Sequence, residues 1–261
     1  MANRRFSLFP GSPSLKDVFS LRSLRYRWRS GEPVLTTSIM AVCVVVWLIE
    51  TVLRMVWPAG LNIIVGYGAL MPGIAAYHPW TFITSMFLHQ PASLWHILFN
   101  MLTLWCVGPV LERMMGHWSY LALYLLSGLA GGTGMMVYAA LAPGGTGWFT
   151  SSYGASGALF GLFAAVLVVY RRIGLDIRSM LIWMAINFLM PVITPNIAWQ
   201  AHVGGFIGGG LFAWLLVSGL RALRGKSLLR RTAVYGAAML AALIAIDAWC
   251  DASNFATLLM H

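Results

Sequence analysis

Seven long apolar stretches dominate this sequence and limit what it can fold into. They cover residues 35–57, 94–111, 118–141, 156–170, 177–193, 199–220 and 232–250. Each is long enough, or nearly so, to cross about 30 Å of hydrocarbon. Backbone polar groups in lipid must be paired internally, and these runs are too long for barrel strands. The sequence therefore predicts an all-α, polytopic transmembrane helical bundle with about seven spans.

The distribution of charge supports this number of spans. Only 9% of the residues are charged, whereas a soluble domain carries about a quarter. The net charge is nevertheless +10. With seven spans, every Lys and Arg except Arg54 falls on the same side as the N-terminal arm, which the positive-inside rule makes the cytoplasm. The charge thus indicates topology and contact with anionic lipid at the cytoplasmic face, and we expect no nucleic-acid partner.

Three parts follow one another along the chain. We expect residues 1–33 to form a basic cytoplasmic arm, 34–220 a six-helix core, and 221–261 a cytoplasmic linker and a seventh transmembrane helix. The arm lacks the apolar segment of a secretory signal, although its Arg- and Ser-rich composition leaves an organellar transit peptide open. Segment 58–93 is rich in Pro, Gly and aromatic residues, so we expect it to lie at the membrane interface.

Four polar residues within the apolar runs mark a candidate site, because such residues are costly in lipid. His96 and Asn100 lie one turn apart early in the second run, Ser156 opens the fourth run, and His202 lies early in the sixth. These three spans run in the same direction across the membrane. Their first turns therefore share one face, and the four side chains are predicted to converge just below the outer surface.

Small residues are predicted to bring the fourth and sixth spans together. Glycines spaced four apart let membrane helices approach closely, and they occur here at Gly157, Gly161, Gly205 and Gly209. Contact between these faces would bring Ser156 beside His202, which could accept the hydroxyl proton. No carboxylate falls near them, so the pair would be a dyad rather than a triad. Because Ser156 also begins its helix, an oxyanion there would gain backbone donors, with His96 or Asn100 supplying more.

Each residue also has a structural interpretation. The Gly-x-Ser-Gly pattern alone is a weak signal of catalysis. His96 and Asn100 could instead form hydrogen bonds between helices. His89 with His96 could hold a metal, but no third ligand of suitable type is evident. Glu50 and Asp247, which also lie in spans, are interpreted as packing or interface residues. The functional interpretation depends on all the elements occurring together.

Over about residues 36–220 the sequence resembles the rhomboid family of intramembrane serine proteases. Residues 96–113 are similar to the second helix of that family, 154–157 to its G-x-S-G nucleophile motif, and 201–209 to its A-H-x-x-G-x-x-x-G base motif. The seventh span resembles the bacterial "six plus one" form. Motifs in three helices occur in the family's order.

The resemblance implies a role for each matched residue. Ser156 would be the nucleophile, and His202 the general base and then the general acid. His96 and Asn100 would form the oxyanion hole with the backbone N–H of Ser156. Supporting roles are implied for the glycines of the two motifs, Gly154, Gly157, Gly205 and Gly209.

Further positions match structural features of the family. His89 ends the first-loop motif and is implied to be structural, and Phe160 occupies the place of an aromatic residue that packs on the catalytic histidine. Residues 112–113 match a structural motif at the cytoplasmic end. One departure is clear: the family's first loop usually carries Trp-Arg, and here Trp80 is followed by Thr81.

The implied activity is hydrolysis of peptide bonds in or near the transmembrane segments of other membrane proteins, through an acyl-enzyme on Ser156. The substrate would enter laterally, past 177–193, and present a small residue before the cut. No metal or organic cofactor is expected. The implied location is a bacterial inner membrane with the N-terminus in the cytoplasm.

Two other classes of function are less well supported. Non-catalytic relatives that bind unstable membrane segments typically lack the serine or the histidine, and both are present here. A transporter should show internal repeats with broken helices in matching halves, and the sequence shows none.

Overall fold

The structure, a computed structural model, describes residues 21–174, 176, 178, 181–182, 184–186 and 198–259. Within these residues the fold is helical apart from one isolated bridge between Leu70 and Ser152. The elements in chain order are α2 (Leu21–Arg29), α3 (Val34–Val56), α4 (Pro58–Gly68), η1 (Pro72–Ile74), α5 (Thr81–Thr84), α6 (Leu94–Met115), α7 (His117–Leu141), η2 (Pro143–Phe149), α8 (Ser156–Ile173), α10 (Trp199–Ser218), α11 (Arg221–Arg224) and α12 (Leu228–Leu259).

Six helices in the described part of the chain are long and apolar enough to cross a membrane. They are α3, α6, α7, α8, α10 and α12 up to Ala252. Each corresponds to one of the predicted apolar runs, and α12 is longer than its run because the helix continues through polar residues at both ends. The predicted fifth span, 177–193, falls mostly on residues outside the described set. The prediction of an all-helical, multi-pass membrane protein is confirmed.

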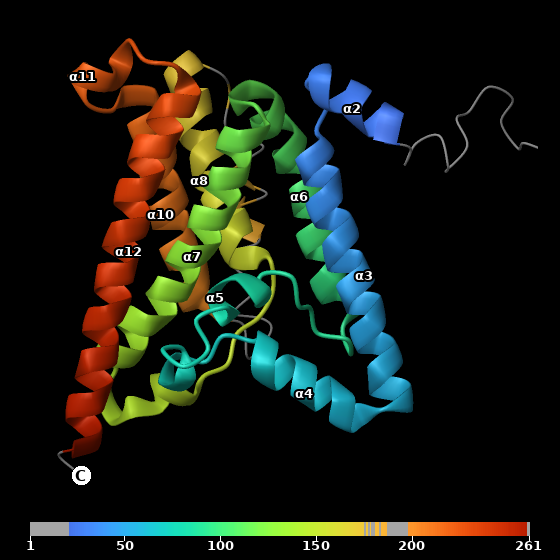
Figure 1. Cartoon of the computed structure of the whole chain (residues 1–261), viewed down its shortest axis with the longest axis vertical. Coiled ribbons are helices and arrows are strands. Elements are labelled where there is room, and N and C mark those ends of the chain that lie inside the picture. Colours follow the sequence, from blue (N-terminus) through green and yellow to red (C-terminus); the bar gives the residue numbers. More distant parts are fainter. Residues whose placement is uncertain are drawn as a thin grey trace, which may run out of the picture.

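Helix α7 forms the centre of the bundle (Figure 1). In its most apolar stretch, two thirds of the residues of α7 are buried. The corresponding share is 17% for α3 and for α12, so these two helices lie at the periphery. Helices α8, α10 and α12 pack on α7, while α3 lies on the other side beside α6 (Figure 1). The central trio of α7, α8 and α10 carries most of the tight packing.

The two ends of the bundle differ in chemistry. At one end lie α2 and α11, which carry Arg22, Arg25, Arg27, Arg29, Arg221 and Arg224 (Figure 1). At the opposite end α4 turns across the end of α3 (Figure 1) and contacts α5. This second end exposes large apolar and aromatic side chains, among them Trp57, Ile63, Tyr67, Tyr77 and Trp80. Such side chains favour the boundary between headgroups and hydrocarbon.

A buried carboxylate joins the helices near the basic end. Glu112 at the end of α6 accepts hydrogen bonds from the backbone N–H groups of Leu35 (2.8 Å) and Thr36 (2.7 Å), which are free at the start of α3. His117 Nδ1 lies 2.6 Å from the same carboxylate, and its Nε2 lies 2.9 Å from the carbonyl oxygen of Trp28. The Trp28 and His117 rings stack at 4.0 Å. Glu112 therefore ties α2, α3, α6 and α7 together.

Candidate active site

Glycines set the distance between α8 and α10. A Cβ built on Gly205 would collide with the backbone carbonyl group of Gly157, and one on Gly209 with the backbone of Gly161. The two predicted glycine pairs thus face each other. Helix α7 approaches the same place, since a Cβ on Gly131 would lie 2.9 Å from the carbonyl oxygen of Ala201. Backbones this close leave room for short side chains only, and they bring the starts of α8 and α10 together.

This close approach puts Ser156 and His202 within hydrogen-bond distance. His202 Nε2 lies 2.9 Å from Ser156 Oγ. The Phe160 ring, one turn beyond the serine on α8, stacks on the imidazole with centroids 4.2 Å apart and planes 17° apart. An imidazole held on one face by an aromatic ring has few alternative rotamers. The geometry suits proton transfer from Ser156 to His202.

His202 has no carboxylate behind it in the described part of the chain. Its side chain is buried, and Nδ1 has no hydrogen-bond partner there. If Nε2 accepts the serine proton, the hydrogen of the neutral ring is on Nδ1. Stacking on Phe160 and burial, rather than an acidic residue, hold this ring in place. The arrangement is a pair of residues and not a Ser-His-Asp triad.

The residue two positions before the serine must be a glycine for two reasons. Gly154 has a φ of +138°, which side-chain-bearing residues rarely adopt. A Cβ there would also lie 3.0 Å from His96 Nε2 and 3.8 Å from Ser156 Oγ. The space in front of Gly154 is therefore bordered by both His96 and Ser156.

The strand-like segment before Ser156 is hydrogen-bonded to the loop that follows α4. Leu70 and Ser152 exchange two backbone hydrogen bonds of 2.9 and 2.8 Å, and the N–H of Gly154 donates to the carbonyl oxygen of Ser85 at 2.8 Å. The loop between the first two spans thus holds the segment that leads into α8 and Ser156. Its folding is a precondition for the site.

Hydrogen bonding assigns the tautomer of His96. Its Nδ1 accepts from the backbone N–H of Gln90 at 3.1 Å, and a backbone N–H can only donate. The hydrogen of a neutral His96 is therefore on Nε2, the atom next to Gly154 and Ser156. This N–H is oriented to donate to an oxygen that forms beside the serine.

Asn100 lies one turn below His96 on α6, and its side chain is buried. Its Nδ2 donates to the carbonyl oxygen of His96 at 2.7 Å. Its Oδ1 has no hydrogen-bond partner among the described residues. Donation to an oxyanion would use the second hydrogen of Nδ2.

His89 packs behind His96 with ring centroids 5.3 Å apart. It lies in the loop before α6 and is fully buried, with Nδ1 3.2 Å from the carbonyl oxygen of Phe87. Burial, together with the neighbouring His96, lowers the pKa of His89 from 6.5 to about 3. The ring is therefore neutral at neutral pH. No group of three potential metal ligands occurs within the part of the chain that is described.

The loop around the Trp80–Thr81 departure is held by local hydrogen bonds. Trp80 Nε1 donates to the carbonyl oxygen of Tyr67 at 2.8 Å, and the indole stacks on His78 at 4.8 Å. Thr81 is buried and its hydroxyl donates to the carbonyl oxygen of His78 at 2.7 Å. Thr84 adds a bond of 2.8 Å to the carbonyl oxygen of Gly68. The loop is thus anchored without an arginine at position 81.

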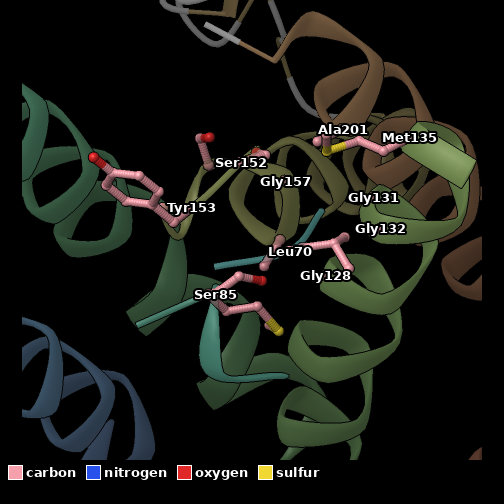
Figure 2. Close-up of a pocket in the computed structure, with 14 residues that line it drawn as sticks. Leu70, Ser85, Gly128, Gly131, Gly132, Met135, Ser152, Tyr153, Gly157 and Ala201 are labelled. Carbon is pink, nitrogen blue, oxygen red and sulfur yellow. The ribbon is translucent and has the colours of Figure 1, made fainter. Parts of the chain in front are cut away.

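A small pocket opens beside the serine. It is lined mainly by small residues, and its larger ones are Leu70, Met86, Met135 and Tyr153; the others are Ser85, Gly128, Gly131, Gly132, Ser152, Gly154, Ser156, Gly157, Ala158 and Ala201 (Figure 2). Gly128, Gly131 and Gly132 come from α7, and Ala201 comes from α10, beside His202. A pocket bounded by glycine backbone has room for small groups only beside Ser156.

Sequence reasoning missed several residues of this region. Ser85, Ser152 and Tyr153 lie next to the site because of the loop's fold, and only the position of Tyr153 directly before the Gly154 motif hinted at it. Burial and, second, the charge of Glu50 raise the pKa of Tyr153. Glu50, expected to be a packing or interface residue, is buried with its carboxylate against the backbone N–H of His89.

Four polar residues, His96, Asn100, Ser156 and His202, form a cluster within this helical fold. The fold and this cluster define a class of membrane protein. The model of the rhomboid domain matches residues 76–219, which is more than half of the chain. The match contains α6, α7, α8 and α10 and therefore all the residues of the cluster. This chain belongs to the rhomboid family.

Several named members of the family are similar to it. The putative rhomboid protease YdcA of Bacillus subtilis is 34% identical over 186 residues, which cover 69% of this chain and 87% of the relative. The rhomboid protease GluP of the same organism is 34% identical over 155 residues, covering 56% of this chain and 28% of GluP. RHOMBOID-like protein 5 of Arabidopsis thaliana is 30% identical over 145 residues, covering 53% of this chain and 44% of the relative.

Proposed function

We propose that this protein is an intramembrane serine endopeptidase that cleaves peptide bonds in or near the transmembrane segments of other membrane proteins. The observation that carries the proposal is the 2.9 Å contact between Ser156 Oγ and His202 Nε2, with the Nε2–H of His96 beside the same serine. A serine without an adjacent base is a poor nucleophile, and an oxyanion without donors is unstable. In this proposal residues 34–220 form the catalytic core.

In the first step, Ser156 Oγ attacks the carbonyl carbon of the scissile bond while His202 Nε2 takes its proton. The negative charge on the carbonyl oxygen is stabilised by the N–H of Ser156, Nε2–H of His96 and Nδ2–H of Asn100. Such donors are most effective in a low-dielectric site, because no water has to be reorganised. His202 then gives the proton to the leaving amine, and an ester on Ser156 remains.

In the second step, water attacks the ester carbonyl with His202 again as the base. The same donors stabilise the second oxyanion, and the proton returns to Ser156 Oγ as the acid product leaves. The atoms balance with peptide and water as the only reactants, and no cofactor takes part.

The pocket beside Ser156 supports a preference for a small side chain directly before the cut. Part of its wall is formed by Gly128, Gly131 and Gly132 of α7, with Ala201 of α10 next to Gly131 (Figure 2). A larger side chain there would meet backbone atoms that cannot rotate away. By family resemblance the substrate enters laterally past residues 177–193.

The orientation in the membrane follows from the basic end. Helices α2 and α11, with their arginines, lie at the same end of the bundle (Figure 1), and the positive-inside rule puts that end in the cytoplasm. We propose a bacterial inner membrane, a cytoplasmic N-terminus, and contact of this end with anionic lipid headgroups. The site then lies toward the outer face.

The test is a cleavage assay with purified full-length protein in detergent and a single-span fluorogenic substrate. Wild type, Ser156→Ala, His202→Ala and the control Ser151→Ala are compared, since Ser151 is an exposed serine five residues before the nucleophile. Loss of the base is expected to lower kcat by about 10²–10⁴-fold. Ser156→Ala is expected to reduce cleavage to background, and Ser151→Ala to retain it.

A folded wild type that binds the substrate without cleaving it would contradict this proposal. It would support the non-catalytic class, in which unstable membrane segments are bound only. Cleavage that survives Ser156→Ala would contradict the assignment of the nucleophile.

A further inference from the structure

Glu50 is an acidic residue within a membrane-spanning helix, and it is fully buried. A carboxylate in such a place is costly unless it forms specific bonds. Glu50 Oε2 accepts a hydrogen bond of 3.0 Å from the backbone N–H of His89, 39 residues further along the chain. The bond links α3 to the loop directly before α6.

The adjacent residue of that loop is held from the same helix. Trp47, one turn before Glu50 on α3, directs its indole N–H to the carbonyl oxygen of Gln90 at 3.4 Å. Helix α3 therefore contacts the His89–Gln90 segment twice, once at an N–H and once at a C=O. The peptide group between these two contacts consists of the C=O of His89 and the N–H of Gln90.

The N–H of Gln90 is the donor that His96 Nδ1 accepts at 3.1 Å. This bond decides which ring nitrogen of His96 carries the hydrogen and how the ring is turned. With Nδ1 fixed, Nε2–H lies beside Gly154 and Ser156. A shift of the Gln90 backbone would release the ring to turn or to change tautomer.

We propose that Glu50 is a positioning residue: through the backbone of His89 and Gln90 it holds His96 with its Nε2–H directed to the oxyanion site beside Ser156. This inference rests on the proposed function, since it assigns Glu50 to the oxyanion site of that reaction. Glu50 touches neither the substrate nor Ser156, so its effect acts through His96 alone. The stabilisation it provides is needed only when the oxyanion forms.

The role requires an acceptor at position 50 rather than a charge. Glu50→Gln keeps a side-chain oxygen that can accept from the N–H of His89, whereas Glu50→Leu removes it at similar size. We expect Glu50→Leu to lower kcat by about 10–100-fold with KM changed less than about twofold, because misplacing a donor by about 1 Å costs up to about 10²-fold. Glu50→Gln is expected to stay within about threefold of wild type.

A double-mutant comparison separates positioning from general destabilisation. In a His96→Ala background the donor is absent, so Glu50→Leu should cause no further loss of kcat. A purely structural role would lower activity by the same factor in both backgrounds. Should Glu50→Leu not fold, Trp47→Phe removes the second contact from α3; a loss of a few-fold in kcat is expected, again absent in the His96→Ala background.

These measurements use full-length protein in detergent, with thermal unfolding recorded for each variant. The proposal for Glu50 is overturned if Glu50→Leu has wild-type kcat, if Glu50→Gln is as impaired as Glu50→Leu, or if the loss persists unchanged without His96. Each of these outcomes leaves Ser156-dependent cleavage by wild type intact. Absence of such cleavage in wild type overturns the proposed function itself, and the positioning role with it.

Discussion

A methyl group added at Gly205 is expected to separate the serine from its base. Helix α10 meets α8 at this glycine, only three residues after His202 and opposite Gly157, the residue after Ser156. The Cβ of an alanine would lie 2.8 Å from the carbonyl carbon of Gly157, and nearer still to its oxygen. No side chain is involved on the other helix, so the contact is relieved only if the backbones move apart.

The size of the effect follows from that geometry. Carbon atoms pack at about 3.5–4.0 Å, so the helices must separate by about 1 Å. A shift of this size would lengthen the 2.9 Å contact between Ser156 Oγ and His202 Nε2 to roughly 3.9 Å, beyond hydrogen-bond distance. A displacement of about 1 Å costs about 10²-fold in rate, or about 2.7 kcal/mol.

The assay compares kcat of wild type, Gly205→Ala and Gly236→Ala on the same fluorogenic substrate. Gly236 lies in α12, and a Cβ there would meet its nearest neighbour, Leu126, at an ordinary 3.6 Å. This control adds the same methyl group to a membrane helix of the same bundle and is expected to retain full activity. A folded Gly205→Ala protein with activity within about threefold of wild type would show that Gly205 does not set the distance between Ser156 and His202.

Three other results are expected. His96→Ala should lower kcat by about 10²–10³-fold with little change in KM, since it removes one oxyanion donor; an unchanged kcat would remove His96 from the oxyanion site. Phe160→Leu removes the ring that stacks on His202, so it should raise the activation barrier by about 0.5–1.5 kcal/mol and lower kcat two- to tenfold. Phe160→Tyr keeps the stacked ring and should keep kcat. The pKa of His89 is about 3 in the folded protein and 6.5 in the unfolded chain. Between pH 6.5 and pH 3 the unfolded chain therefore binds a proton that the folded protein does not. The free energy of unfolding falls as the pH falls through this range, by up to about 1.4 kcal/mol per pH unit. His89→Gln should therefore lose less thermal stability than wild type on acidification, and equal losses would contradict this.

The sequence allowed much of this site to be predicted because the signals are local. Span direction follows from the apolar runs and the basic residues, and it puts Ser156, His202 and His96 at one depth without any knowledge of packing. The glycine spacing then indicated which helix faces meet. These features depend on helix periodicity and membrane crossing alone.

The remaining features depend on how segment 58–93 folds. The bridge between Leu70 and Ser152, and the bond between Ser85 and Gly154, join residues more than sixty positions apart in irregular backbone. Irregular loops carry no periodicity from which such pairs follow. Glu50 gave a signal, as an acidic residue in a span, but its partner is a backbone N–H, which every residue except proline has.

The position of Ser156 at the start of a helix could be predicted from the sequence, but its surroundings could not. The serine does begin α8, as the start of the fourth apolar run indicates. The direction in which the proposed oxyanion donor, Nε2–H of His96, points depends, however, on the hydrogen bond that His96 Nδ1 accepts from Gln90. That bond is set by the loop before α6 and not by the residues of the helix.

The most direct test of the central claim is whether Ser156 is an activated serine. Full-length protein is treated with a fluorophosphonate, digested, and the modified peptide identified by mass spectrometry, with His202→Ala as the matched comparison. We expect one adduct, on Ser156, formed in wild type and lost or slowed by at least about 10²-fold in His202→Ala. Folded wild type that remains unlabelled at Ser156, or labelling that proceeds equally fast without His202, would contradict it.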